Sequence, residues 1–151
     1  MNVRKVFLIL ACLSSGLSAF LPYYTVSVNG VINGKPVNES ATATLFPQFY
    51  GIVIVVSAVL IILFTLAGIK KGYVITSLVN IGASLWGLFT MTLQQDSDTA
   101  VLRITGNFVN ALSNNSDYKL TVTDGPGFFM LIFSAVLVLV LMIWNAIGND
   151  D

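Results

Sequence analysis

The stretch Gly68-Ile69-Lys70-Lys71-Gly72 is the only charged break in a long apolar tract, and it decides the fold. Apolar residues dominate positions 49–67 on one side and 73–93 on the other. Two adjacent lysines between glycines predict a tight cytoplasmic hairpin that joins two membrane helices. The hairpin divides the chain into two halves, each with an apolar segment, a polar loop and a second apolar segment.

The composition is that of a membrane protein. The chain has 151 residues, of which 56% are hydrophobic and 9% are charged, whereas an ordinary soluble domain has roughly 25% charged residues. The mean hydropathy is +0.86. The formal net charge of zero gives no indication of nucleic acid as a partner. The chain has no His and a single cysteine, Cys12, which excludes an internal disulfide.

Four apolar segments, at about residues 6–24, 49–69, 72–93 and 127–147, are predicted to be transmembrane helices. Outer loops are predicted at about residues 25–48 and 94–126. The chain, residues 1–151, is thus predicted to be a single polytopic membrane domain. The fold class is an all-α four-transmembrane-helix bundle with a small extracellular cap of β-sheet and helix. The first segment, behind a basic head, also fits a secretory signal peptide, but we prefer a retained helix.

The outer loops carry patterns of regular structure. Residues 24–28 and 37–45 alternate in polarity, and Asn29-Gly30 and Asn33-Gly34 are turn dipeptides, so the first loop is predicted to form a β-hairpin. In the second loop, residues 98–112 are predicted to form a helix capped by Asp98, and residues 118–123 a strand that joins the hairpin in a sheet. The apolar face of that helix consists of Val101, Ile104, Phe108 and Leu112.

The basic residues predict the orientation. Arg4, Lys5, Lys70 and Lys71 lie at the ends of apolar segments on one side. The bias of lysine and arginine toward short cytoplasmic loops places both termini and the hairpin in the cytoplasm. Compact tails and the lack of outer cysteines favour a bacterial plasma membrane.

An internal echo precedes two of the apolar segments. Residues 42–50 and 121–129 share the pattern Thr-x-Thr-x-x-Pro-x-Phe-aromatic. One explanation is a two-fold internal repeat, with proline in the first turn of each helix and its axis along the membrane normal. The other explanation is convergence, because any passage from a strand to a membrane helix favours such residues.

The apolar segments contain no Asp, Glu, Lys, Arg or His, although proton relays and ion-coupled transporters generally need one. Small and polar residues there are candidates either for helix packing or for lining a pore between several copies. They are Ser14, Ser15, Ser18, Asn80, Ser84 and Gly87.

Charged residues of the outer loops are candidates for binding a partner at the outer surface. These are Asp96, Asp98, Arg103, Asp117 and Lys119. The acidic members, with Asp124, are a weak candidate for a Ca²⁺ site. A solvated acidic rim is the default interpretation, and neither a metal nor a cofactor is predicted.

Four helices, a tight inner hairpin and a strand-rich first outer loop resemble the plan of claudins. The Trp-Gly-Leu-Trp signature and the two loop cysteines of claudins are missing, and Trp86-Gly87-Leu88 falls in the third apolar segment. The resemblance is one of plan, so it implies no function for this chain.

The absence of a catalytic constellation predicts a non-enzymatic membrane protein. We expect a subunit or interaction partner in a membrane or cell-surface complex, which binds through its outer cap and its helix faces. Besides the lipid bilayer, its partner would be another membrane protein or a second copy. The alternatives are a homo-oligomeric channel or small transport component and an immunity or exclusion protein of the bacterial envelope.

Overall fold

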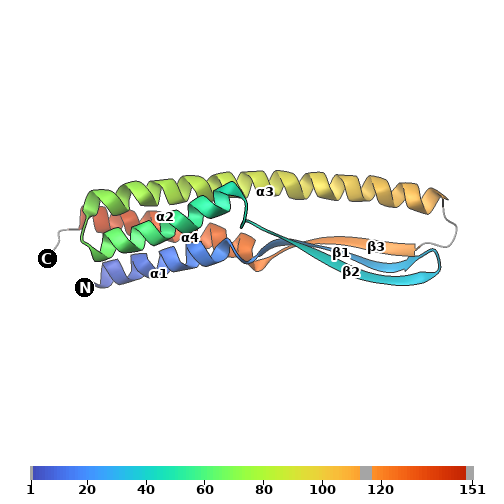
Figure 1. Ribbon diagram of the computed structural model, residues 1–151, viewed down its shortest axis with the longest axis horizontal. Helices are drawn as coiled ribbons and strands as arrows, with labels where there is room; N and C mark the ends of the chain where they lie inside the picture. The colour runs from blue at the N-terminus through green and yellow to red at the C-terminus, as the bar shows by residue number, and fades with distance from the viewer. Residues whose placement is uncertain (1, 113–116, 149–151) are drawn as a thin grey trace.

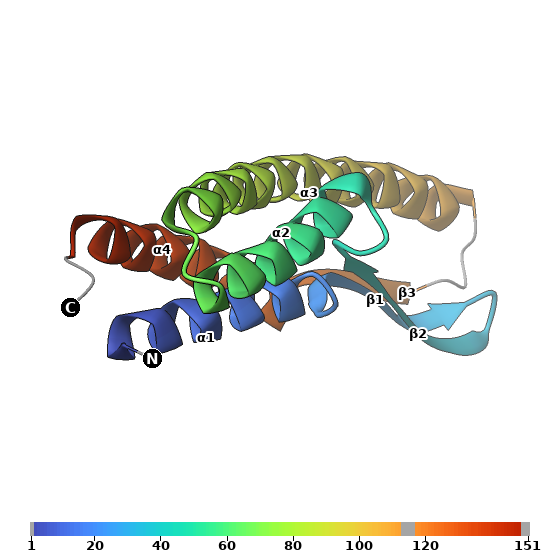
Figure 2. The same cartoon turned by 60° about the vertical axis from the view of Figure 1, so that its left-hand side comes forward.

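The computed structural model describes residues 2–112 and 117–148. The elements follow the chain in the order α1 (Val3–Ser18), β1 (Pro22–Ile32), β2 (Lys35–Thr44), α2 (Phe49–Leu66), α3 (Lys70–Leu112), β3 (Asp117–Asp124) and α4 (Pro126–Ile147). The molecule is elongated (Figure 1). At one end α1, α2, α4 and the first half of α3 pack side by side, and we call this part the bundle. At the other end the sheet runs beside the second half of α3 (Figure 1 and Figure 2).

The predicted hairpin is confirmed as a tight connection between α2 and α3. Behind the end of α2, Gly68 adopts a left-handed φ of 71°. The amide of Ile69 donates to the carbonyl oxygen of Phe64 at 2.9 Å, and the amide of Gly68 donates to that of Thr65 at 3.3 Å. These are the two bonds of a Schellman motif. Because glycine adopts this conformation without steric cost, Gly68 stops α2 and lets α3 begin at Lys70.

The third helix is much longer than the predicted membrane segment. α3 continues for 43 residues, which is about 64 Å at about 1.5 Å per residue and twice the roughly 30 Å of a hydrocarbon core. Between Gly87 and Gly106 the sequence has neither Gly nor Pro, so nothing there ends a helix. The predicted boundary near residue 93 and the predicted cap at Asp98 are therefore wrong. Near residue 93 the side chains change from mainly apolar to mainly polar, although the helix continues.

The predicted fold class is wrong in two respects. In the described part of the chain, three helices are long and apolar enough to cross a membrane: α2, α4 and the 38 residues of α3 from Lys70 to Asn107. α1 has 16 residues and is not among them, so a four-transmembrane-helix bundle does not fit. The chain is also not all-α, because three strands form an antiparallel sheet.

The first helix is shorter than predicted because of a proline. α1 ends at Ser18, and β1 begins at Pro22 rather than near residue 25. Proline lacks the amide hydrogen that a helix interior needs. It also biases the residue before it toward extended backbone, so the apolar run continues while the helix does not.

The predicted β-hairpin and the predicted third strand form one sheet with the strand order β2-β1-β3. Asn33 and Gly34 connect β1 to β2 with φ values of 51° and 75°, as a type I′ turn requires. Asn29-Gly30, the other predicted turn, lies inside β1 and pairs with strands on both sides. A dipeptide that favours a turn can therefore lie within a strand when neighbouring strands pair with it on both sides.

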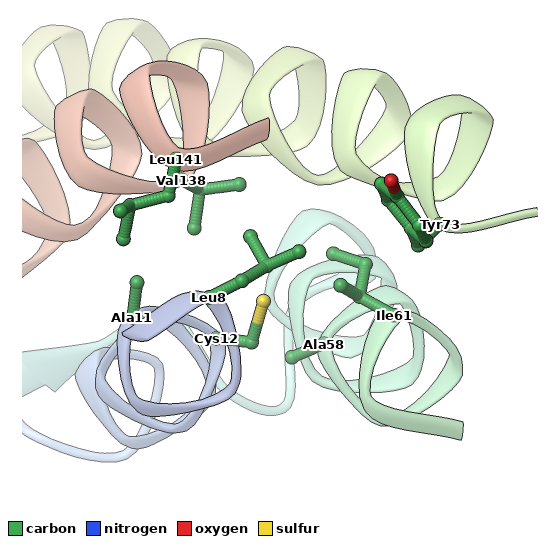
Figure 3. Close-up of a cluster of buried hydrophobic side chains, with 8 residues drawn as sticks. All are labelled: Leu8, Ala11, Cys12, Ala58, Ile61, Tyr73, Val138 and Leu141. Atoms are coloured by element: carbon green, nitrogen blue, oxygen red, sulfur yellow. The ribbon is translucent and has the colours of Figure 1, made fainter. Parts of the chain in front are cut away.

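The core of the bundle lies where the helices meet in pairs. α1 packs against α2 and α4, and α3 packs against the same two helices. Figure 3 shows Leu8 and Cys12 of α1 meeting Ile61 of α2 and Val138 of α4, all fully buried. A second buried cluster, which includes Tyr23, joins the bundle to the sheet.

Close backbone contacts fix the junction between bundle and sheet. The amide of Gly125 donates to the carbonyl oxygen of Tyr23 at 2.7 Å, which connects the start of α4 to β1. A Cβ atom at Gly51, in the first turn of α2, would overlap the carbonyl group of Leu45. Glycine is therefore required where α2 crosses the end of the hairpin.

The two stretches of the internal echo adopt different geometries. Pro126 is the first residue of α4, as predicted, whereas Pro47 lies before the start of α2. In α2 the first aromatic residue, Phe49, is exposed and Tyr50 is buried, while in α4 the second, Phe129, is the exposed one. These differences favour convergence over an internal repeat.

Candidate functional site: a groove in the projecting arm

We call the sheet together with residues 94–112 of α3 the arm. The sheet of the arm has two chemically different faces, because alternate residues of a strand share a face. We call one side the apolar face. By the register of the strands it carries Tyr24, Val26, Val28, Glu39, Ala41, Ala43, Leu120, Val122 and Asp124. The other side, called the polar face, carries Thr25, Ser27, Asn29, Asn38, Ser40, Thr42, Lys119, Thr121 and Thr123.

The apolar face is attached to α3 at the inner end of the arm. The hydroxyl of Tyr24 donates to Oδ2 of Asp98 at 2.6 Å. Nε2 of Gln95 donates to Oδ1 of Asp124 at 3.0 Å. Because Tyr24 is buried and Asp98 half-buried, their bond is shielded from water. These two bonds set the distance between helix and sheet where the arm leaves the bundle.

Farther out, the sheet and α3 border an open groove of about 430 Å³. It is lined by Val26, Val28, Glu39, Ser40, Ala41, Asp98, Val101 and Leu102. Ligand pockets in proteins are typically about 300–1,000 Å³. Val101 exposes 61% of its surface and Ile104 exposes 71%, so the predicted apolar helix face is accessible on this part of α3. The side chains of Phe108 and Leu112 lie outside the described residues.

Two carboxylates give the groove a negative potential. Glu39 on β2 and Asp98 on α3 are the charged groups among its described lining residues. Burial, and then the hydrogen bond to Asp98, raises the pKa of the Tyr24 hydroxyl above its usual value. The hydroxyl therefore stays a neutral donor at pH 7. Asp98 accepts this bond through Oδ2.

A separate polar group lies inside the bundle. Asn80 of α3 is fully buried and makes three hydrogen bonds. Its Oδ1 accepts from Oγ of Ser15 at 2.9 Å, and its Nδ2 donates to the carbonyl oxygen of Ile54 at 3.1 Å and to Oγ of Ser57 at 2.9 Å. Asn80 thus connects α1, α2 and α3 within their apolar interior. We call this group the Asn80 network.

The other packing or pore candidates are dispersed. Ser18 is buried, and its hydroxyl donates to the carbonyl oxygen of Ser15 at 2.6 Å. Ser84 is buried, and its Oγ has no hydrogen-bond partner within the described chain. Ser14 is half-buried beside α4, and Gly87 is buried. Of the six candidates, Ser15 and Asn80 are brought together by a side-chain hydrogen bond.

The outer-surface candidates are dispersed as well. Asp98 lines the groove, whereas Asp96 and Arg103 are exposed on α3. Asp117 and Lys119 lie on the polar face of β3. Among the residues that the structure describes, no three His, Cys, Asp or Glu side chains gather where they could hold a metal ion. The described carboxylates therefore give the Ca²⁺ alternative no support.

Sequence reasoning missed Tyr24 and Glu39 as parts of a site. The alternation of residues 24–28 and 37–45 did predict which side chains share a face. It could not show what that face meets, because α3 was expected to end near residue 93. The absence of Gly and Pro after Gly87 was the signal that would have extended the helix over the sheet.

Comparisons of the chain with models of protein families, with curated proteins and with solved structures find no match.

Proposed function

We propose that this chain is a non-enzymatic integral membrane protein whose arm binds another membrane or cell-surface protein. The observation that carries the proposal is the accessible apolar groove between the sheet and α3. Exposed apolar surface on a part that projects from the apolar bundle marks a binding site more often than a chance feature. The three helices that are long and apolar enough to cross a membrane supply the anchor.

The distribution of basic residues supports one orientation of the anchor. Arg4 and Lys5 lie in the first turn of α1, and Lys70 and Lys71 begin α3, all at the end of the bundle away from the arm (Figure 1). The bias of basic residues toward the cytoplasm supports an orientation with this end inside and the arm outside the membrane. The membrane is then the plasma membrane, and we retain a bacterial host as part of the proposal.

The channel alternative receives less support. Ser15, Asn80 and Ser84 are fully buried within a single chain. The amide nitrogen and the amide oxygen of Asn80 are also hydrogen-bonded to three groups of that same chain. Residues with this surrounding do not line a pore formed between copies. An immunity protein would use the same arm, with a partner that it meets only under attack.

The test is the native particle. The protein is solubilised mildly from its membrane, the mass of the particle is measured and its proteins are identified. We expect the particle to contain a second protein and to be heavier than one chain of 16.2 kDa. We expect that protein to be lost on charge reversal of one sheet face, either Glu39→Lys or Lys119→Glu. Val136→Ala, on an exposed position of α4, is the control and should keep it. A bare monomer, or a second protein that survives both reversals, contradicts the proposal.

A further inference from the structure

The inference concerns β2, the strand at one edge of the sheet. The sheet contacts α3 chiefly through the opposite edge strand, β3, where Gln95 holds Asp124. β2 is ten residues long, and its residues from Asn38 to Thr42 are exposed. Edge strands are commonly protected by lysine or proline. Here Lys35 and Pro36 protect the outer tip. On the inner part, from Asn38 to Thr42, Glu39 is the one charged side chain, and a basic residue of an added strand would neutralise it.

The groove continues along this inner part of β2. Glu39, Ser40 and Ala41 form one wall of the groove, and Val101 and Leu102 of α3 form another. A strand added to β2 would extend the sheet sideways, and its alternate side chains would lie on the apolar face. These side chains would then enter the groove beside α3. Pairing of backbones supplies affinity in such complexes, and pockets for alternate side chains supply specificity.

The charges of the groove specify the added strand further. Glu39 lies on the apolar face of β2, and Asp98 faces it from α3. Among the described lining residues of the groove there is no cation. Lys119 lies on the polar face and Lys35 at the tip, and Arg103 is exposed on α3. A lysine or arginine in the added strand would be attracted by both carboxylates.

We propose that the β2 edge and its groove bind, by strand addition, an extended segment of a partner protein in which apolar residues alternate with polar ones and one groove-facing residue is basic. This inference rests on the proposed function of the arm. It names the surface that the partner uses and the chemistry of the bound segment.

The test uses the full chain in lipid nanodiscs and a fluorescent peptide, Val-Thr-Val-Thr-Lys-Thr-Val-Thr-Val. We expect saturable binding by fluorescence anisotropy and protection of β2 amides from hydrogen exchange. The same peptide with Glu in place of Lys should bind on the order of tenfold more weakly. A peptide with proline at alternate positions, which cannot pair, should not bind.

Two neighbouring substitutions provide a matched control. Ala41 and Thr42 are both exposed on β2, but Ala41 lies on the apolar face and Thr42 on the polar face. Ala41→Trp should fill the groove and abolish binding, whereas Thr42→Trp should leave it unchanged. Likewise Glu39→Lys should weaken binding of the lysine peptide, and Asn38→Lys on the polar face should not.

The outcomes separate this inference from the proposed function. Absence of binding, equal loss with Ala41→Trp and Thr42→Trp, or binding without protection of β2 amides overturns strand addition at β2. If the native particle in that case still holds a second protein that is lost on Lys119→Glu, the proposed function stands and the partner uses the polar face of the arm. If the native particle is a bare monomer, the proposed function fails as well. Binding of a second copy of the chain through β2, in place of a partner, also overturns the inference.

Discussion

The bundle and the arm differ in the side chains that they expose. The interior of the bundle is mainly apolar, as Leu8, Ile61 and Val138 show, but it also encloses polar groups. In the bundle the interior holds Ser15, Ser57, Asn80 and further hydroxyl groups, while large apolar side chains such as Trp86 and Phe89 are each 67% exposed. In the arm the polar face of the sheet is outside, and valines and alanines face α3. Each arrangement suits the surroundings that the proposed function gives it, which are hydrocarbon around the bundle and water around the arm. A single helix, α3, takes part in both.

The bundle and the arm obtain the specificity of their contacts in different ways. Helices in hydrocarbon gain little from burying apolar surface, so small residues and hydrogen bonds such as those of Asn80 select their contacts. A sheet in water gains from burying its apolar face. In the arm that gain is incomplete, because the groove stays open, and a partner can supply the rest.

The largest expected effect is at the junction between the two parts. Gly51→Ala would place a Cβ atom against the carbonyl group of Leu45. That group cannot move without shifting the hairpin, so we expect the free energy of unfolding to fall by about 3 kcal/mol. Gly82→Ala is the matched control, since nothing lies within 4 Å of its added Cβ. It should be neutral or stabilising by up to about 1 kcal/mol. Thermal unfolding in nanodiscs measures the stability of both variants. Equal effects of the two substitutions would contradict a close contact between Gly51 and Leu45.

The next effect sharpens the description of the bundle. Asn80→Leu removes three hydrogen bonds and leaves the hydroxyl of Ser15 without its acceptor, whereas that of Ser57 keeps its bond to the carbonyl oxygen of Ile54. We therefore expect the free energy of unfolding to fall by about 2 kcal/mol. Ser15→Ala should cost less than this and Ser14→Ala least, because Ser14 lies outside the Asn80 network. The measurement is again thermal unfolding. An Asn80→Leu protein of unchanged stability would contradict the claim that the Asn80 network stabilises the bundle.

A smaller effect should be confined to the arm. Tyr24→Phe removes the bond to Asp98, for an expected cost of about 1 kcal/mol. Hydrogen exchange should become faster in β1 and in residues 94–107, while exchange in the bundle stays unchanged. Thr25→Val, which removes a hydroxyl from the polar face of the same strand, is the control. Faster exchange throughout the bundle would show that bundle and arm unfold as one unit.

The smallest effect is the response of the arm to alkali. Burial, and then the bond to Asp98, raises the pKa of Tyr24 above its usual value of 10.0. The unfolded chain therefore releases this proton first, and the stabilisation, complete below pH 10, declines as the pH rises toward the raised pKa. Circular dichroism followed against pH should show this decline, and Tyr24→Phe should reduce it. Part of the slope should persist, since burial also raises the pKa of Tyr23.

Much of the local structure could be predicted from the sequence, because it depends on residues with strong local preferences. Gly68 and the lysines specify the α2–α3 turn, Asn33-Gly34 specifies the hairpin, and strand alternation specifies the two faces. The predicted lengths of α1 and α3 are wrong, because hydropathy does not measure the length of either helix. Pro22 ends α1 inside an apolar run, and α3 continues through a polar one.

The groove could not be predicted from the sequence. It depends on the distance between α3 and the sheet, which the Tyr24–Asp98 bond and the junction contacts determine. These contacts join residues far apart in the chain, and no periodicity reports them. Asn80 was recognised as the most polar residue at its depth, but its partners on α1 and α2 appear only when the helices are packed.

The uninterrupted course of α3 has a mechanical consequence. A continuous helix that packs in the bundle at one end and borders the groove at the other couples the two mechanically. A tilt of about 10°, within the range of membrane helices, moves the far end of the outer 19 residues by about 5 Å. A displacement of this size would change the width of the groove, because Val101 and Leu102 of α3 line it.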